Sequence, residues 1–280
     1  MRALRYILCD VFTDRPLAGN QLAVFTDARG LDSGLMQSIA REMNLAETVF
    51  VQEPQAGGHA RLRIFTPTRE LPFAGHPTLG SAFVLGGPLQ LERLELETGA
   101  GTVPVRLERE GPRVVFGWME QPLPTWRAYD DAPKLLAALG LAASELPILE
   151  YDNGPRHVLV TAPDVDSVAA LAPDLGGLAS FLDGGVSVFT SRGPEVRTRM
   201  FAPAQGVPED AATGSAAGPL AVHLAVHGRI AWGEPIRIEQ GAEMGRPSEL
   251  HAVAFGATDR LDRLEVGGAA VIIGRGELRI

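Results

Sequence analysis

The heptapeptide Arg-Leu-Arg-Ile-Phe-Thr-Pro at residues 61–67 returns 136 residues later as Arg-Thr-Arg-Met-Phe-Ala-Pro at residues 197–203. Each copy leads into a short loop that precedes an apolar stretch, at residues 74–78 and 210–215. A repeat with one unit in each half is not a solenoid, because solenoids need at least three stacked units. We therefore expect two related domains that face each other, with the matching loops lining one cleft.

Hydrophobic periodicity predicts the same style of structure in both halves. In the first half it predicts strands near 3–12, 20–26, 46–52 and 60–66 and after residue 90, with helices at 32–43 and 77–86. In the second half it predicts helices at 131–139, 165–171 and 213–227 among further strands. Mixed strands with one main helix per half favour an α+β class.

The domain boundaries follow from the proline-rich segment Glu-Gln-Pro-Leu-Pro at residues 120–124. Closely spaced prolines make a stiff linker between domains. We predict an N-terminal domain over residues 1–120 and a C-terminal domain over residues 121–267. The final strand, residues 268–280, is expected to return to the N-terminal domain.

Composition narrows the possible functions. The chain has 280 residues and a net charge of −9, which argues against a nucleic-acid or anionic-membrane partner. No signal peptide and no apolar run of about 20 residues is visible, so a cytoplasmic protein is expected. Cys9 is the only thiol and Lys134 the only lysine, which makes a two-cysteine mechanism impossible and a pyridoxal Schiff base improbable.

Glu47 is the strongest candidate for catalysis. In the strand-like run Ala-Glu-Thr-Val-Phe-Val at residues 46–51, alternation places Glu47 on one face with Val49 and Val51. A carboxyl group among apolar neighbours has a raised pKa, which suits a general acid or base near neutral pH. The alternatives are a solvated carboxylate at a strand end or an ion-pair partner of an arginine.

His76 and Asp210 stand at the two matching loops. His76 precedes Pro77, and proline favours the first helical position, so the sequence predicts His76 as a helix cap. Asp210 precedes the second apolar helix and has an obvious capping role there. For both residues, a structural role is as well supported as a catalytic one.

Two helix starts directed at one cleft would provide paired anion sites through free backbone N–H groups and the helix dipole. Gly75 and Gly214 would allow a ligand to approach the backbone closely. This pattern favours a substrate that carries a carboxylate. Asn20 and His157 each begin a strand and could reach the same cleft, although turn or strand-end roles are more common for such residues.

Several motifs together resemble the phenazine-biosynthesis PhzF-like family, which has the diaminopimelate epimerase fold. They are Asp-Val-Phe-Thr at residues 10–13 with Gly19 and Asn20, Ala-Glu-Thr-Val-Phe at 46–50, Gly-His-Pro-Thr at 75–78, and Glu-Asp-Ala-Ala-Thr-Gly-Ser-Ala at 209–216. The resemblance covers essentially the whole chain. It implies two pseudo-symmetric domains, each a barrel-like mixed sheet around a central helix, with the active site in the cleft between them and commonly a homodimer.

The resemblance also implies proton transfer at carbon without a cofactor or metal. Glu47 matches the family's general acid/base, His76 and Asp210 its polar partners, and Thr213, Gly214 and Ser215 lie in the loop that holds the substrate carboxylate. Related epimerases use two cysteines, and Ala74 and Ala211 align with those positions. Ala46 replaces a common serine and Ala211 a common proline, which leaves the particular phenazine-pathway substrate open.

The sequence therefore predicts a cofactor-independent isomerase that acts on a small carboxylate-bearing substrate, such as an amino or hydroxy acid. An epimerase or racemase on the same fold is an alternative, as is a metabolite-binding protein without turnover. A metal-dependent hydrolase is less well supported, because the sequence shows no cluster of metal ligands. The physiological substrate and pathway are left open.

Overall fold

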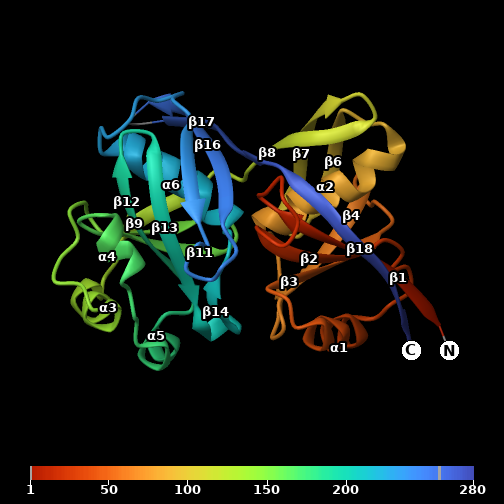
Figure 1. Cartoon of the computed structure of the whole chain (residues 1–280), viewed down its shortest axis with the longest axis horizontal. Helices are drawn as coiled ribbons and strands as arrows, with labels where there is room; N and C mark the ends of the chain where they lie inside the picture. The colour runs from red at the N-terminus through yellow and green to blue at the C-terminus, as the bar shows by residue number, and fades with distance from the viewer. Residues whose placement is uncertain (1, 258–259) are drawn as a thin grey trace.

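The computed structural model describes residues 2–257 and 260–280 of the chain. Figure 1 shows two groups of strands side by side, each arranged around one buried helix, with the N-terminal half on the right. Parallel and antiparallel strand pairs occur together with helices, so the fold is a mixed α/β fold.

Over its described residues, 2–120, the first half contains eight strands and two helices. The strands are β1 (Ala3–Val11), β2 (Asn20–Phe25), β3 (Glu47–Gln52), β4 (Ala60–Phe65), β5 (Glu70–Leu71), β6 (Arg93–Thr98), β7 (Gly101–Glu110) and β8 (Arg113–Glu120). The helices are α1 (Ser33–Met43) and α2 (Gly75–Leu89).

The rest of the chain continues in the same manner. Its strands are β9 (Thr125–Ala128), β10 (Leu149–Asp152), β11 (Arg156–Thr161), β12 (Gly185–Arg192), β13 (Glu195–Ala202), β14 (Val207–Asp210), β15 (Ile236–Gln240), β16 (Ser248–Ala257), β17 (Arg260–Gly268) and β18 (Ala270–Arg279). Its helices are α3 (Ala132–Leu139), α4 (Val165–Ala169), α5 (Leu175–Phe181), α6 (Gly214–Val226) and the 3₁₀ turn η1 (Pro203–Gln205).

Strand pairing repeats between the halves. In the first half β2 and β3 are parallel, β3 and β4 are antiparallel, and β4 pairs with β5 and, in parallel, with β6. In the second half the same relations hold for β11 and β12, for β12 and β13, and for β13 with β14 and β15. The heptapeptide repeat falls on β4 and β13, which occupy corresponding places in the two patterns.

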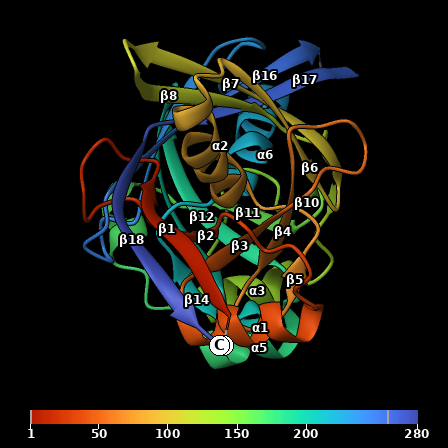
Figure 2. The same cartoon turned by 90° about the vertical axis from the view of Figure 1, so that its right-hand side faces the viewer.

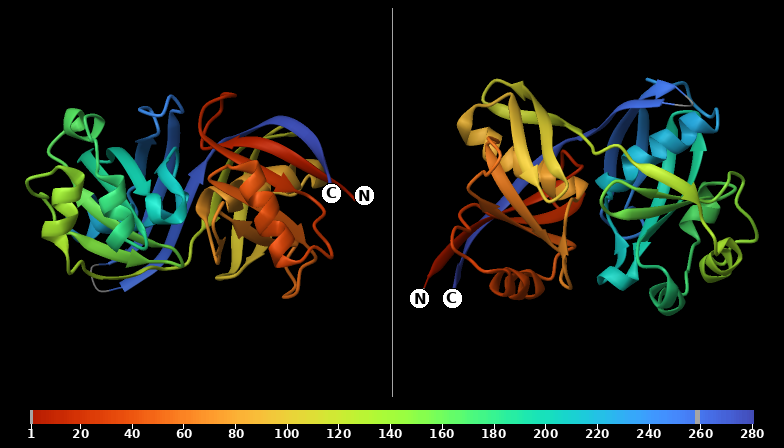
Figure 3. Two further views of the ribbon diagram at one scale, coloured as in Figure 1. Left: turned by 90° about the horizontal axis from the view of Figure 1, so that it is seen from below. Right: turned by 180° about the vertical axis from the view of Figure 1, so that it is seen from behind.

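The two halves are joined along one side. β8 pairs antiparallel with β17, and β18 pairs with β1, so the C-terminal strand adds to the first half. Figure 3 shows the chain crossing between the halves twice, after β8 and before β18, with both termini at the outer end of the first half. The division into domains at residue 120 stays a prediction.

Helices α2 and α6 are the centres of the two halves. Both are apolar around their circumference and buried along most of their length, as expected for helices enclosed by a sheet. Figure 2 looks along the molecule and shows both helices inside the ring of strands. Their side chains belong to one continuous apolar core that includes Leu79 and Leu220.

Local signals predicted some boundaries well and others badly. Asp32 caps α1 by accepting a hydrogen bond from the Leu35 N–H, and Asn44 ends it in the left-handed conformation, so α1 occupies the stretch where a helix at 32–43 was predicted. The predicted capping role of His76 is wrong, because Ala74 is the N-cap and His76 is the second residue of α2.

Pro219 lies inside α6, as the sequence indicated. None of the described helices is long and apolar enough to cross a membrane. The cytoplasmic location stays a prediction.

Candidate active site

Glu47, His76 and Asp210 meet between the two halves. Glu47 is the first residue of β3, His76 lies in the first turn of α2, and Asp210 ends β14. The Oε2 atom of Glu47 lies 3.4 Å from Nδ1 of His76, and both side chains are largely buried. Glu47 is buried because β3 is covered on both faces, with Thr48 and Phe50 as inaccessible as Val49. Val49 and Val51, which the alternation places on the same face as Glu47, are buried as well.

Asn20 connects these groups across the two halves. Its Nδ2 donates to Oδ1 of Asp210 at 2.7 Å and to the Ala212 carbonyl at 2.9 Å, and it lies 3.2 Å from Nδ1 of His76. The amide nitrogen has two hydrogens, which Asp210 and Ala212 accept, so its contact with Nδ1 does not by itself set the tautomer of His76. Burial lowers the pKa of His76 to about 3, so the imidazole is neutral at neutral pH.

The two carboxyl groups differ in their hydrogen bonds. Asp210 accepts from Asn20 and from the Thr213 hydroxyl, the latter at 2.7 Å. Oε2 of Glu47 has no hydrogen-bond partner within residues 2–257 and 260–280. The bonds to Asp210 stabilise its ionised form, whereas Glu47 lacks such donors. In a pair that carries one negative charge, the charge therefore resides on Asp210 and the proton on Glu47.

The pKa shifts agree with this assignment. Burial raises the pKa of Glu47 well above its usual value, and the negative charge of Asp210 raises it further. Burial also raises the pKa of Asp210 to about 6, against the lowering effect of its bonds to Thr213 and Asn20. A buried carboxyl group with a raised pKa and an unpartnered oxygen is suited to exchange a proton with a bound molecule.

The starts of α2 and α6 meet at this place. A Cβ atom on Gly75 would lie 2.5 Å from the carbonyl carbon of Gly214 and 2.6 Å from the Ser215 nitrogen. Thr213 is fixed just before α6, since its N–H donates to Oε1 of Gln240 at 3.1 Å and its hydroxyl accepts from Nε2 of Gln240 at 2.9 Å. Two helix N-termini side by side direct their free N–H groups and positive dipole ends toward one region, which favours an anion there.

Ser215 is held from two directions. Its hydroxyl lies 2.9 Å from Nε2 of His157, whose pKa burial lowers to about 4. Its carbonyl accepts from Nδ2 of Asn153 at 3.0 Å. That carbonyl would normally bond the N–H four residues later, but residue 219 is proline and has none. Pro219 therefore leaves the Ser215 carbonyl free for Asn153, a consequence that the sequence alone did not suggest.

These groups surround a small cavity. It has a volume of about 30 Å³ and is lined by polar residues that include Glu47, His157, Asp210 and Ser215 and by apolar ones such as Phe73. His76 and Asn20 contact the lining carboxyl groups instead of lining the cavity. A cavity of this size holds about one or two water molecules, whereas ligand sites commonly measure roughly 300–1,000 Å³.

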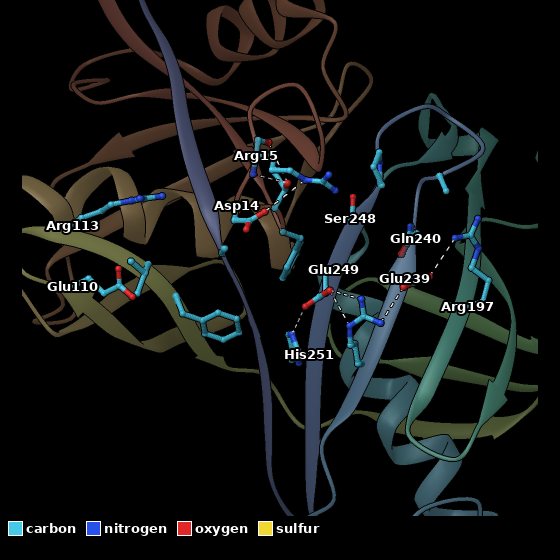
Figure 4. Close-up of a pocket in the computed structure, with 18 residues that line it drawn as sticks. Asp14, Arg15, Glu110, Arg113, Arg197, Glu239, Gln240, Ser248, Glu249 and His251 are labelled. Atoms are coloured by element: carbon cyan, nitrogen blue, oxygen red, sulfur yellow. Dashed lines mark hydrogen bonds and ion pairs between the residues drawn. The ribbon is translucent and has the colours of Figure 1, made fainter.

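A larger cavity of about 610 Å³ lies elsewhere between the halves, and its lining includes several charged residues, such as Arg15, Arg197 and Glu249 (Figure 4). Nη2 of Arg197 lies 2.5 Å from Oε1 of Glu243, a residue that does not line the cavity. The carboxyl groups with raised pKa values do not line this cavity. The acid–base chemistry therefore belongs to the smaller one.

Sequence reasoning missed three amides that hold the helix starts, namely Gln121, Asn153 and Gln240. Nε2 of Gln121 donates to the Gly214 carbonyl at 2.6 Å. Asn153 could have been suspected, because it begins the Asn-Gly-Pro turn that leads to His157. Gln240 ends an ordinary strand, and nothing in its neighbourhood marks it.

The repeat offset also changes before the site. β4 and β13 keep the offset of 136 residues, but α2 begins at Gly75 and α6 at Gly214, an offset of 139. Ala74 is the N-cap of α2, whereas Ala211 lies two residues before the N-cap Thr213. Ala74 and Ala211 therefore stand at different distances from the two helix starts, Gly75 and Gly214. Their alignment with the two cysteines of the related epimerases stays a prediction.

Comparison with known proteins places this geometry in a family. Residues 9–276 match the PhzC-PhzF family, described as phenazine biosynthesis-like protein. The chain is 52% identical to the trans-2,3-dihydro-3-hydroxyanthranilate isomerase of Pseudomonas fluorescens, over 98% of both chains. It is also 52% identical to the isomerase of the same name from Pseudomonas aeruginosa, over 97% of this chain and 98% of that one.

A solved structure agrees. The phenazine biosynthesis protein of the PhzF family from Bacillus anthracis superposes with a TM-score of 0.87 and 25% sequence identity, with both chains covered completely. Similarity of this extent to the Pseudomonas enzymes confirms the prediction of an isomerase. The chain belongs to the PhzC-PhzF family of phenazine biosynthesis-like proteins.

Proposed function

We propose that this protein isomerises trans-2,3-dihydro-3-hydroxyanthranilate, or a close carboxylate-bearing analogue, by moving one proton between carbons without a cofactor. The observation that carries the proposal is the buried Glu47, whose Oε2 is unpartnered within the described residues and whose side chain lines the cavity between the halves. The 52% identity to enzymes named for this substrate supports its choice.

The chemistry of that substrate suits a single acid/base. Its ring carries conjugated double bonds next to the carbon that bears the hydroxyl group. Removal of a proton from that carbon gives a delocalised anion, and return of the proton to another ring carbon completes an isomerisation with no change in atom count. One carboxyl group on one face of the ring can perform both steps. Ionised Glu47 is the base in the first step, and its protonated form is the acid in the second.

The remaining site residues position the substrate and stabilise charge in the site. Neutral His76 lies beside Glu47, with Nδ1 3.4 Å from Oε2. Asp210 carries the negative charge of the pair when Glu47 is protonated, and it attracts a substrate amino group. Thr213, Gly214 and Ser215 present the start of α6 to the substrate carboxylate, together with Gly75 at the start of α2, and His157 orients the Ser215 hydroxyl.

The proposal includes the arrangement of the whole chain. The halves act as two pseudo-symmetric domains, residues 1–120 with 268–280 and residues 121–267, and the active site lies in the cleft between them. The repeated strand pairing and the two central helices support this division. A homodimer is part of the same proposal and rests on the family resemblance alone.

The test is turnover in deuterated buffer with Glu47→Gln. The wild-type protein is expected to convert the substrate and to incorporate deuterium at carbon, and Glu47→Gln to lose both by several orders of magnitude. Glu53→Gln is the matched control, because Glu53 follows the same strand but is 76% exposed. Retained turnover in Glu47→Gln would remove Glu47 from this role. Recovery of substrate with an inverted stereocentre would show an epimerase instead.

A further inference from the structure

The two halves are fastened firmly along one side of the active site. Asp10 is fully buried and accepts from Nη2 of Arg246 at 2.5 Å, while Arg246 also donates to the carbonyls of Ala18 and Gly19. Backbone bonds reinforce this contact, from Gly19 N–H to the Pro247 carbonyl and from Glu249 N–H to the Phe12 carbonyl. The β8–β17 pairing and both chain crossings add to the joint, so separation of the halves on this side would break many bonds.

A third cavity adjoins the active site. It has a volume of about 230 Å³ and shares Leu71, Pro155 and Gln205 with the wall of the cavity that contains Glu47. Its rim carries Arg69 from the first half and Arg156 and Asp183 from the second. Because these cavities have three lining residues in common, a modest movement of that wall would join them.

Few and exposed polar contacts cross this rim. Nη1 of Arg69 lies 3.3 Å from Oδ1 of Asp183, and the two side chains are 42% and 65% exposed. Within the second half, Nη2 of Arg156 lies 2.5 Å from Oδ2 of the same aspartate. Thr68 also crosses, through a hydrogen bond of 2.9 Å from its hydroxyl to the Gln205 carbonyl. Exposed ion pairs stabilise a structure by only about 0–1 kcal/mol each, so this rim can open at little cost.

We propose that this rim is the substrate entrance. Arg69 and Arg156 bind the substrate carboxylate there, and in the absence of substrate the carboxylate of Asp183 takes its place. The inference rests on the proposed function, since it requires a substrate with a carboxylate. The cavity of about 30 Å³ is too small to admit such a molecule unless part of its wall moves. Because many bonds hold the halves together on the side of Asp10 and Arg246, the wall moves at the Arg69 rim.

The charges at the rim fit this role. Asp183 is shared by two guanidinium groups, so an arriving carboxylate can replace it on either one without leaving a cation unpaired. Guanidinium groups bind carboxylates in a bidentate geometry, and positive charge at a mouth speeds the arrival of anions. The chain as a whole carries a net charge of −9, which repels an anionic substrate elsewhere on the surface.

The test compares Arg69→Gln, Arg156→Gln and Asp183→Asn. The first readout is kcat/KM with trans-2,3-dihydro-3-hydroxyanthranilate. The second is the association rate constant of 3-hydroxyanthranilate, the aromatic compound with the same substituents, by stopped-flow fluorescence at low and high salt. The control is Arg229→Gln, because Arg229 is paired with Glu145 in an ion pair of similar exposure, 42% and 57%, away from the rim.

Each arginine variant is expected to lower the association rate constant about threefold to tenfold at low salt, with a smaller difference at high salt. Asp183→Asn is expected to raise it about twofold to threefold, because it frees both guanidinium groups. Arg229→Gln leaves it unchanged. Opposite effects of two partners in one ion pair cannot arise from a shared loss of stability, which urea denaturation measures separately.

Equal decreases in Arg69→Gln and Asp183→Asn would overturn the proposal, as would association rate constants that match the control. If the wild type does not bind 3-hydroxyanthranilate, the proposed entrance is overturned together with the proposed substrate class. A different outcome separates the two proposals. If the wild type binds this probe with the expected charge dependence but does not turn over the dihydro compound, the proposed reaction is refuted and the proposed entrance is still supported.

Discussion

Gly75→Ala should separate the two helix starts that form the site. The added Cβ would lie 2.5 Å from the Gly214 carbonyl carbon and 2.6 Å from the Ser215 nitrogen. Carbon atoms in ordinary contact are about 3.5–4.0 Å apart. Both opposing atoms are backbone, so no side-chain rotation can relieve the clash. The starts of α2 and α6 must therefore move apart by about 1 Å.

The expected loss follows from that displacement. A misplacement of about 1 Å between catalytic and binding groups lowers the rate by about 100-fold, or about 2.7 kcal/mol in activation free energy. Overpacking of this kind costs about 1–3 kcal/mol in stability, partly offset by the better helix propensity of alanine. We expect kcat/KM to fall more than stability explains, because the protein at 25 °C remains folded.

Gly87→Ala is the matched control on the same helix. No atom lies within 4 Å of the position that its Cβ would take. Alanine there should gain about 0.5–1 kcal/mol in stability and leave turnover unchanged. The assays are steady-state kinetics and urea denaturation of all three proteins. Gly75→Ala with wild-type kcat/KM would refute the idea that the direct contact between helix starts sets the geometry of the site.

Two further outcomes concern protonation. The kcat/KM of the wild type should rise with pH on the acid side as Glu47 ionises, and Asp210→Asn should move that limb to lower pH, because the charge of Asp210 raises the pKa of Glu47. A limb at the same pH in this variant would contradict the coupling. The pKa of buried His223 is lowered to about 3, so below its unfolded value of 6.5 the unfolded chain binds a proton that the native protein does not. Between about pH 5.5 and 4, the free energy of unfolding of the wild type should therefore fall by about 1.4 kcal/mol per pH unit more than that of His223→Leu. The same pH dependence for both proteins in urea denaturation would contradict this.

The secondary structure was predicted well where the signals are local. The α1 caps Asp32 and Asn44 act through bonds to residues three or four positions away, so the sequence contains their full cause. The His76 cap failed because proline is permitted at several positions of a first turn, and the packing of Gly75 against Gly214 decided where α2 begins. Short strands such as β9 and β14 were missed, since their pairing partners, rather than their composition, define them.

The candidate residues were named from sequence, but their chemistry was not decided there. Nothing in the sequence shows that Asn20 reaches Asp210, 190 positions away, or that Glu47 lacks a hydrogen-bond donor that Asp210 has. Burial and hydrogen bonding set the two pKa values, and both depend on how the halves pack.

The repeat, the scarcity of thiols and lysines, and the loop motifs determined by themselves the family and the list of polar candidates, because these features depend only on residue order. The tertiary structure alone decided which carboxyl group holds the proton, which residues begin the two central helices, and which exposed contacts lie beside the cavity that contains Glu47. Those properties arise from contacts between segments that are distant in the chain, and the free energy of such contacts depends on their three-dimensional packing.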